Sequence, residues 1–463
     1  MMLHRPSRFT VALALLALPA VAGAQAFGLN EIGSCALARG FAVTSAPCAD
    51  ASNIYWNPGA MPAKQGLTAL GGVAIIQISG DFTRDSSFKS YAAQVPTAYV
   101  PHFFANYRTG DVAFGLGVYV PYGLTSQWGN DFPGRFSAVK ASLKTIYVQP
   151  NISYRINDNW SIGGGPVIGN STVELTQAID LSSTQANAAA TFGNLGVAKY
   201  TEFGRATLKG SAMAYGVNVG IHGRISPEWE LGMRFLSQLS FNYDNADATF
   251  AQTATGINLA FGNPLGLPAG TPLDNLLTPQ FSGTGALTPQ KVTTQIRHPA
   301  QIQAGLAYSG WTNTVVSADV AYVGWKSFNQ LPVNFQGAAK ANSKVLVEDY
   351  NNTSSIRLGL EHKLQNNWLF RSGFVATTSA APPETVTPLL PEQDRVLGML
   401  GGFMPLTTTI GLDAAYSHIF TPGARGRIDE RTNGMSSAQA LALNSGAYTL
   451  NANILSLSLK YNF

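Results

Sequence analysis

Two cysteines, Cys35 and Cys48, lie 13 positions apart near the start of this 463-residue sequence. In an oxidising compartment a disulfide across so short a loop is the default expectation, and it would add about 3 kcal/mol by restricting the unfolded chain. Two free buried thiols are the alternative. We expect no metal site there, because no histidine or further cysteine lies near them.

The other residues that could do chemistry form no catalytic set. The six histidines are scattered, and the sequence has neither a Gly-x-Ser-x-Gly motif nor a phosphate-binding glycine loop. Asp413 and His418 are an acid–histidine pair only by proximity in sequence, and a hydrolase would also need a placed serine. We therefore expect no enzyme and no cofactor.

The N-terminus has the three parts of a secretory signal peptide. Arg5 and Arg8 precede a short apolar run at 11–18, and the small residues that follow offer two overlapping cleavage sites. We expect residues 1–26 to be removed on export, and this export supplies the oxidising compartment assumed for the cysteines.

The composition indicates a membrane protein without membrane helices. Charged residues make up 12% of the chain, about half the usual share of a soluble protein. No stretch after the signal approaches 18 consecutive apolar residues, so no transmembrane helix is predicted. The small net charge of +4 gives no reason to expect a nucleic-acid partner. An exported, charge-poor chain of this kind is typical of a transmembrane β-barrel.

A period of two recurs along most of the chain. In residues 455–463 the odd positions are Leu, Tyr or Phe and the even ones Ser, Lys or Asn, and 112–120 and 213–221 alternate similarly. One face would meet lipid and the other a lumen. A soluble sandwich also alternates, but its outer face would carry more Lys and Glu.

This alternation predicts an all-β fold, a 14-stranded antiparallel barrel, and the number is even as in bacterial single-chain barrels. Short connections alternate with long ones, as periplasmic turns alternate with external loops. The predicted strands are 67–80, 97–108, 110–122, 143–156, 159–175, 206–226, 228–244, 291–309, 312–329, 353–365, 367–379, 393–403, 406–420 and 447–463.

Aromatic residues mark one end of the predicted barrel. Trp160, Trp229, Trp311 and Trp368 lie at or beside the short turns, where a girdle at the periplasmic membrane boundary is expected. The last strand ends on Phe463 and would close the barrel against the first strand. Such an ending resembles the signal read by the barrel-assembly machinery, so we expect the outer membrane of a Gram-negative bacterium, its lipid and that machinery as surroundings and partner.

The segment before the first strand lacks alternation. We divide the chain into a signal peptide (1–26), an N-terminal plug (27–66) inside the lumen and a barrel (67–463). A lumen of this size would otherwise be a water-filled bore. An extended periplasmic tail is the alternative.

The segment FGLNEIGSCALARG near the start of the chain, the segment DAAYSHIF near its end, and others between them resemble the FadL-type family of outer-membrane transporters for long-chain fatty acids and hydrocarbons. Asn57-Pro58-Gly59 stands where the family's plug carries Asn-Pro-Ala, so the third residue departs from the pattern. The resemblance covers essentially the whole mature chain, and its order and spacing make it specific. The other segments are VPHF, YRINDNWSIGGG, ADVAYVGWKSFNQL, QNNWLFRSGF and LPEQDR.

The resemblance implies a 14-stranded barrel with an N-terminal hatch, in agreement with the strand count. It also implies a mechanism in which an apolar ligand adsorbs between external loops and moves to a pocket in the barrel. A hatch change, to which Asn57, Pro58 and Gly59 would belong, and a kink in the third strand then open a lateral route into the bilayer.

The third-strand kink is expected at Pro121, Tyr122 and Gly123. Proline cannot donate a ladder hydrogen bond and marks an edge, a bulge or a strand end, so a local gap in the wall is one interpretation. The alternative is that Pro121 simply ends the strand.

Leucines in the predicted external loop 257–278 are candidate ligand contacts, because exposed apolar patches usually mark binding sites. We single out Leu265, Leu267, Leu276 and Leu277. Packing of loop against loop is the alternative.

A fatty-acid carboxylate needs a cation or several donors once it leaves water. The resemblance places Gln177, near Glu174, where fatty-acid members carry a basic residue, and places Lys344 near a second family lysine. The loss of one basic partner leaves room for uncharged ligands, and Lys344 could equally be a solvated loop residue.

We therefore predict passive transport of hydrophobic small molecules across the outer membrane by a monomer. The alternative is a structural barrel whose external loops bind a host or phage partner, which charged, variable loops would favour. A porin for polar solutes is a third interpretation, which the plug opposes.

Overall fold

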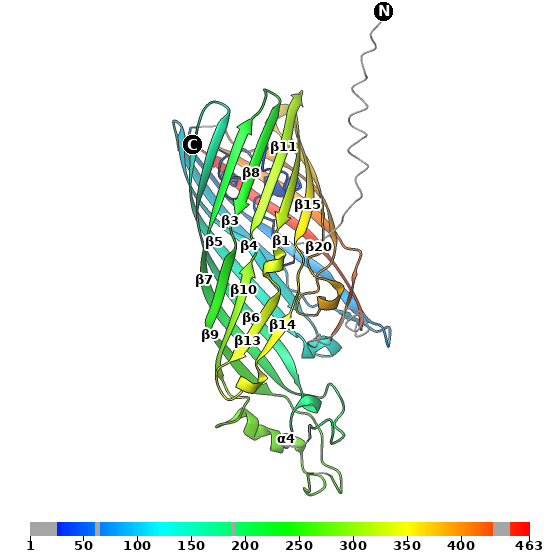
Figure 1. Cartoon of the computed structure of the whole chain (residues 1–463). Helices are drawn as coiled ribbons and strands as arrows, with labels where there is room; N and C mark the ends of the chain where they lie inside the picture. Colours follow the sequence, from blue (N-terminus) through cyan, green and yellow to red (C-terminus); the bar gives the residue numbers. More distant parts are fainter. Residues whose placement is uncertain (1–25, 61–64, 187–189, 264, 429–444) are drawn as a thin grey trace, which may run out of the picture.

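The computed structural model describes residues 26–60, 65–186, 190–263, 265–428 and 445–463. The predicted signal peptide lies outside these residues apart from Ala26. In the described part, antiparallel strands close into one barrel, with short turns at one end and long loops at the other (Figure 1). No helix among these residues has the length and apolar character needed to cross a membrane.

Fourteen strands form the wall, and two of them are interrupted. The uninterrupted ones are β1 (Gly66–Arg84), β3 (Ala98–Thr109), β4 (Val112–Gln127), β5 (Lys140–Arg155), β6 (Trp160–Asp180), β7 (Glu202–Arg224), β12 (Thr314–Val323), β15 (Thr353–Lys363), β16 (Leu369–Thr377), β17 (Arg395–Pro405), β18 (Ile410–Phe420) and β20 (Gly446–Asn462). The interrupted ones are β8 (Trp229–Leu236) with β9 (Leu239–Gln252), and β10 (Gln290–His298) with β11 (Gln301–Trp311).

Smaller elements lie in the lumen and in the loops. The short strands are β2 (Ser90–Ala92), β13 (Gln330–Phe335), β14 (Lys344–Val347) and β19 (Ala424–Gly426). The α-helices are α2 (Ser34–Ala38), α3 (Asn53–Trp56) and α4 (Leu273–Leu277). Single 3-10 turns occupy Pro133–Phe136, Leu181–Ser183, Thr278–Phe281, Trp325–Ser327, Lys340–Asn342, Gln365–Asn367 and Pro383–Thr385.

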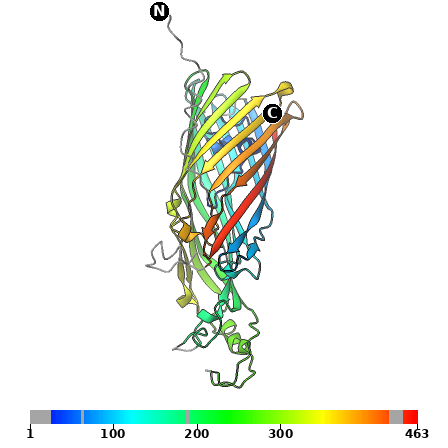
Figure 2. The same ribbon diagram turned by 90° about the vertical axis from the view of Figure 1, so that its right-hand side faces the viewer.

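The first and last strands close the barrel. β1 pairs with β20 from Thr68 opposite Asn462 to Arg84 opposite Gly446. Figure 2 shows this contact between the blue and red ends of the chain. This pairing leaves no free edge between the first and last strands, and the prediction of a 14-stranded barrel is confirmed.

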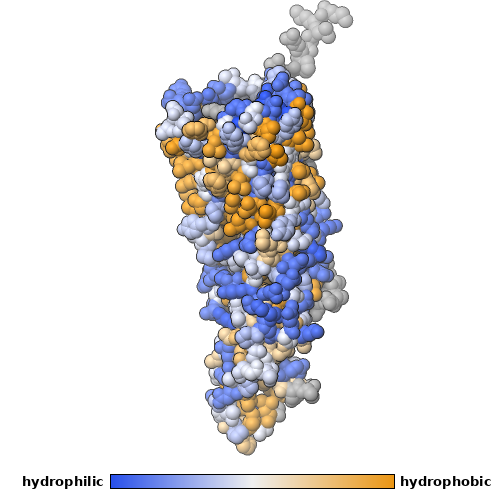
Figure 3. All heavy atoms as spheres, turned by 90° about the vertical axis from the view of Figure 1, so that its left-hand side faces the viewer, coloured by the Kyte–Doolittle hydropathy of each residue, from blue (hydrophilic) through white to orange (hydrophobic). Residues whose placement is uncertain are grey.

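The two faces of the strands differ as the alternation predicted. On β20, Leu455, Leu457 and Leu459 are exposed, whereas Ser456 and Ser458 point inward and are buried. On the face drawn in Figure 3, hydrophobic side chains gather toward the short-turn end of the barrel, and hydrophilic ones lie farther along. Trp229, Trp311 and Trp368 are exposed at the short-turn end. This apolar region fits a lipid-facing belt.

The N-terminal segment lies inside the barrel, toward the short-turn end (Figure 1). Its helices α2 and α3 are fully buried, and Cys35 and Cys48 form a disulfide that closes the chain between them. The segment therefore does not extend away from the barrel.

Several strands run farther into the long loops than predicted, such as β4 to Gln127 and β9 to Gln252, and three predicted strands are broken or end early. The strand expected over 291–309 breaks after His298, because Pro299 has no N–H to donate, and the one expected over 228–244 breaks at 237–238. The strand expected over 312–329 ends at Val323. The connection expected over 330–352 contains the hairpin of β13 and β14, whose inward residues Leu331 and Val333 are buried.

Candidate functional site

The barrel wall opens between β3 and β4. These strands pair only from Phe103 opposite Val118 to Thr109 opposite Val112. Beyond that point β3 stays with β1 and β4 stays with β5, as far as Gln127 opposite Lys140. Two neighbouring strands thus separate in the part of the wall nearer the long loops.

A bulge in β4 lies at the start of this opening. Its register against β5 shifts by one residue between Tyr119 and Tyr122, at Pro121. Bulges bend a strand, and proline cannot continue the ladder. The strand nevertheless continues to Gln127, so the alternative that Pro121 ends it is wrong.

Residues 27–29, which we call the edge segment, lie on the β4 edge that β3 leaves. The Leu29 N–H donates to the Pro121 carbonyl over 2.8 Å, and the Gly123 N–H donates to the Phe27 carbonyl over 2.9 Å. Tyr122 points inward, and its hydroxyl accepts a 2.8 Å hydrogen bond from Gln301 Nε2. The three predicted kink residues therefore lie where the N-terminal segment meets the wall.

The ring of Phe27 is held by other aromatic rings. Its centroid lies 4.7 Å from that of Trp325 and 5.1 Å from that of Phe328, both edge-to-face. His298 and Tyr122 complete this aromatic cage at 5.7 and 6.0 Å. Such contacts stabilise the ring without a directional bond to any single partner.

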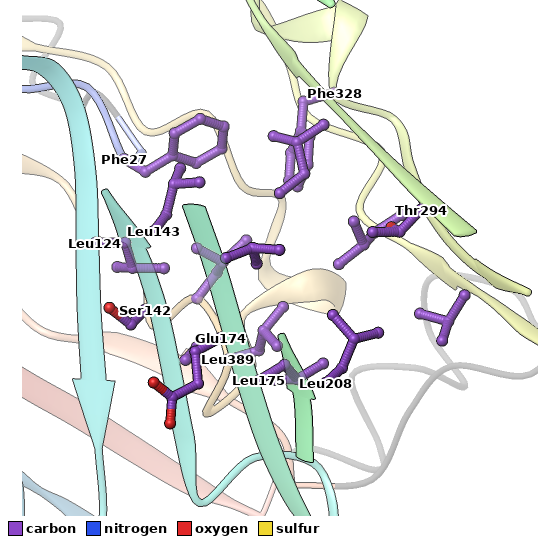
Figure 4. A pocket seen from close by; sticks show the side chains of 16 residues that line it. Phe27, Leu124, Ser142, Leu143, Glu174, Leu175, Leu208, Thr294, Phe328 and Leu389 are labelled. Carbon is purple, nitrogen blue, oxygen red and sulfur yellow. The ribbon is translucent and has the colours of Figure 1, made fainter. Parts of the chain in front are cut away.

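Beside Phe27 is a small cavity of about 60 Å³, which we call the apolar cavity (Figure 4). None of its lining residues, all of them described, is Lys, Arg or His. The Glu174 carboxylate points away from the other lining side chains and pairs with Lys140 at 3.1 Å and Lys209 at 3.6 Å. The lining consists of Phe27, Leu124, Ala141, Ser142, Leu143, Val173, Glu174, Leu175, Leu208, Thr294, Ile296, Phe328, Leu331, Val333, Leu389 and Leu390.

A larger cavity of about 620 Å³, the wall cavity, adjoins the apolar cavity, and Leu124, Ser142, Leu143 and Leu390 line both. Phe27 lines the apolar cavity, whereas Gly28 and Leu29 line the wall cavity. Its lining includes the inward-facing Ile454 and the exposed Tyr99 and Ile146. The wall cavity therefore reaches from the lumen through the gap to the outside of the barrel.

A buried carboxylate holds the start of the described chain against the wall cavity. Glu392 accepts a 2.6 Å hydrogen bond from the Ala26 N–H, and Arg395 pairs with it at 3.1 Å. Burial raises the pKa of Glu392, and the Arg395 guanidinium partly offsets the rise.

The Asn57-Pro58-Gly59 turn fixes the N-terminal segment to the wall. Asn57 Nδ2 donates to the Thr44 carbonyl over 2.7 Å and to the Ile221 carbonyl over 3.0 Å. A Cβ atom at Gly59 would lie 2.4 Å from the Gly220 carbonyl oxygen, so the close approach of the two backbones requires glycine here.

The two positions of the suspected carboxylate site meet in space. Lys344 Nζ lies 3.5 Å from Gln177 Oε1. Lys344 is also opposite Val333, which lines the apolar cavity. The lysine is therefore next to that cavity without lining it.

The four loop leucines lie elsewhere. They belong to the long loop that contains α4, at the far end of the molecule (Figure 1), and none lines either cavity. Leu277 is buried in a cluster with Leu181, Phe203 and Leu273, and Leu265 packs against it.

Sequence reasoning missed the residues that separate and line the cavities, above all Phe27, Glu31, Thr294 and Arg395. Phe27 and Glu31 fall in the segment FGLNE, and Arg395 ends LPEQDR, but neither pattern reveals that the two segments meet. Asp413 and His418 form no pair, because Asp413 bonds to Arg371 and His418 to Asn453.

A family model described as "Outer membrane protein transport protein (OMPP1/FadL/TodX)" matches residues 14–463. A long-chain fatty acid transport protein of Escherichia coli O6:H1 is 25% identical over 434 residues, covering 90% of this chain and 91% of that protein. Outer membrane protein P1 of Haemophilus influenzae is 23% identical over 487 residues, covering 98% of each.

Solved structures share the fold. A Pseudomonas aeruginosa FadL homologue superposes with a TM-score of 0.77 at 20% identity, covering 95% of this chain and 100% of that one. The Pseudomonas putida toluene transporter TodX gives 0.67 at 16% identity, covering 95% and 99%.

Proposed function

The chain belongs to the OMPP1/FadL/TodX family of outer-membrane transport proteins, and we propose that it carries small hydrophobic molecules inward through its wall. In this proposal residues 27–66 act as a hatch and 67–463 as the barrel. The ligand passes by diffusion, as a monomeric barrel allows, and the barrel-assembly machinery inserts the chain. The comparisons favour transport over a structural barrel that binds a host or phage partner.

The interruption between β3 and β4 is the observation that carries the proposal. A closed ladder would present lipid with continuous backbone pairing, whereas here a cavity of about 620 Å³ joins the lumen to the outer surface. The free energy of an apolar solute falls when it moves from water into hydrocarbon. A sideways exit into the membrane is therefore favourable for it. Polar solutes would gain nothing from this route.

Two ligand classes fit the route. The relatives named above include a long-chain fatty acid transport protein and a toluene transporter. The lining of the apolar cavity, without a cation, supports an uncharged hydrocarbon or the tail of a longer ligand. Lys344, next to the cavity, supports a fatty acid whose carboxylate remains outside it.

A titration separates these classes. Purified protein is titrated with palmitate and, separately, with toluene, using the wild type, Lys344→Ala and, as a control, the exposed Lys340→Ala in the same loop. If the lysine holds the carboxylate, Lys344→Ala weakens palmitate binding about 10-fold to 100-fold, the range for a charged hydrogen bond, and leaves toluene unchanged.

Three other results are informative. Binding of toluene alone would assign the protein to hydrocarbons. An equal loss for both ligands would mean that Lys344 acts on the loop and not on a carboxylate. Binding of neither ligand would contradict the transport proposal.

A further inference from the structure

The bulge in β4 is linked to another break in the wall. Pro299 lies between β10 and β11, outside both ladders. Tyr122, which follows the bulge residue Pro121, points inward, and its hydroxyl donates a 3.1 Å hydrogen bond to the Pro299 carbonyl. Because β4 pairs with β3 and β5, whereas β10 pairs with β9 and β13, this bond crosses the lumen. One side chain therefore joins two places at which the ladder is disturbed.

Arg234 fixes the direction of the hydrogen bonds around Tyr122. Arg234 Nη1 donates to Gln301 Oε1 over 3.1 Å, and a guanidinium can only donate. The oxygen of the Gln301 amide must therefore face Arg234, and its Nε2 faces the Tyr122 hydroxyl at 2.8 Å. Because Gln301 Nε2 donates to the Tyr122 oxygen, the Tyr122 O–H points to the Pro299 carbonyl.

Arg234 is itself held by helix α3 of the N-terminal segment. Its guanidinium lies over the Tyr55 ring, 4.1 Å from the centroid, and its Nε donates to Asn218 Oδ1 over 3.1 Å. Asn218 Nδ2 in turn donates to the carbonyls of Ile54 and Tyr55, over 3.3 and 3.1 Å. Arg234, Asn218 and Gln301 are all buried, so water does not compete for these bonds. A chain of directed hydrogen bonds thus leads from α3 to the bulge.

This chain reaches β4 at the point where β3 and β4 part. The last pair of the two strands is Phe103 with Val118, and the bulge follows at Pro121. Free strand edges pair readily, so β4 beyond the bulge would return to β3 unless something holds it away. A side chain that holds the bulge toward the lumen does so.

We propose that Gln301, oriented by Arg234, is a positioning residue of the opening. Through the Tyr122 hydroxyl it links the bulge to the break at Pro299 and keeps β4 apart from β3. Gln301 and Arg234 need not contact the ligand, and neither of these described residues lines the apolar cavity or the wall cavity. The inference rests on the proposed function, since the opening is the exit that this function uses.

Spin labels measure the separation of the two strands. Cysteines replace the exposed Tyr99 on β3 and Ile146 on β5, the partner of β4, and the distance between the labels is measured in the full-length protein in lipid nanodiscs. The native cysteines are bonded to each other and take no label. Tyr122→Phe keeps the ring and removes only the hydroxyl. The labels should come closer in this variant, and its toluene uptake, measured without labels, should fall about 3-fold, as expected for one hydrogen bond.

Gln301→Glu changes the direction of the bonds and keeps a partner for Arg234. A carboxylate still accepts from Arg234, but it also accepts the Tyr122 O–H, which then leaves Pro299. This variant should therefore fold and yet show the shorter label distance of Tyr122→Phe.

Tyr119→Phe is the matched control. The Tyr119 hydroxyl is also buried on β4, but it bonds to Gln149 of the neighbouring β5, so the label distance and the uptake should equal those of the wild type. A wild-type distance in either Tyr122→Phe or Gln301→Glu would overturn the inference, and so would an equal shortening in Tyr119→Phe. If the wild type takes up no toluene, the proposed function fails, while the label distance still decides whether the hydrogen bonds hold the strands apart.

Discussion

The N-terminal segment is held in two different ways. Its body, residues 32–60, is fixed by directional bonds: the Thr44 N–H donates to Asp319 over 2.8 Å, and the Ser34 hydroxyl lies 2.8 Å from that of Ser456. The edge segment, residues 27–29, has two backbone hydrogen bonds to β4 and otherwise rests on ring contacts around Phe27.

This difference indicates which part can move. Breaking the buried polar bonds of the body leaves unpaired groups, whereas an apolar ligand can replace the ring contacts of Phe27 with contacts of the same kind. The body is therefore a fixed partition, and the edge segment is the movable boundary between the two cavities.

Removal of the Asp319 side chain should have the largest effect on the stability of the body of the N-terminal segment. Asp319 is buried, its Oδ2 accepts a hydrogen bond from the Thr44 N–H, and the charges of Arg357 and Arg39 stabilise its ionised form. Asp319→Ala leaves the Thr44 N–H without its acceptor and removes a negative charge that offsets these two positive ones. An unsatisfied buried donor costs about 1–3 kcal/mol, and more where charged groups are involved, so we expect a loss of roughly 4 kcal/mol in the free energy of unfolding. Hydrogen exchange should quicken in peptides of the body, while the exposed Asp244→Ala should leave it unchanged. Equal protection in both variants would contradict a body fixed by polar bonds.

Truncation of Phe27 should have a smaller and local effect. Phe27→Ala empties the aromatic cage and should cost about 3 kcal/mol, the low end for a buried phenylalanine, because the site borders two cavities. Amide hydrogen exchange should become faster at residues 26–31 but not at residues 32–60. Toluene uptake should rise. Phe88→Ala, at an exposed loop position, is the control. Uptake that stays at the wild-type rate would argue against the edge segment as the boundary.

The smallest effect expected is a pH dependence of the edge segment. Glu392 has a raised pKa when the segment is closed, so it binds its proton more tightly there than when exposed to water. The closed state is thus most stable when the pH is below 4.5, the ordinary pKa of a glutamate. It loses stability as the pH rises through the raised pKa of Glu392. Glu31 shifts in the same direction. With a fluorine label on Phe27, the NMR signal of the displaced ring should grow as the pH rises. In Glu392→Gln the population of the displaced ring should depend less on pH. A slope of opposite sign would refute the assignment.

The alternation of side chains predicted the barrel because one residue in two must face lipid, whatever the neighbouring strand. The same signal cannot reveal the gap, since residues 98–102 alternate regardless of whether β4 pairs with them. Pro121 indicated a disturbed ladder, but only the register against β5 distinguishes a bulge from a strand end.

The sequence could not predict the two cavities, for a different reason. Phe27, Leu143, Leu208 and Leu389 line one cavity from positions far apart in sequence, and each reads locally as an ordinary apolar residue. The loop leucines were noticed because they are clustered in sequence, yet they line neither cavity.

A pair of cross-links tests the division between fixed body and movable edge most directly. Gly28 and Tyr122 face each other as a non-hydrogen-bonded pair, whose Cα atoms are about 4.5 Å apart in antiparallel sheets, so cysteines at both positions can form a disulfide. Cysteines at Ser34 and Ser456 would instead tie the body to β20. We predict that oxidising the 28–122 pair stops toluene uptake and that reduction restores it, while the 34–456 cross-link leaves uptake unchanged. Uptake that persists through the first cross-link and stops with the second would contradict the account.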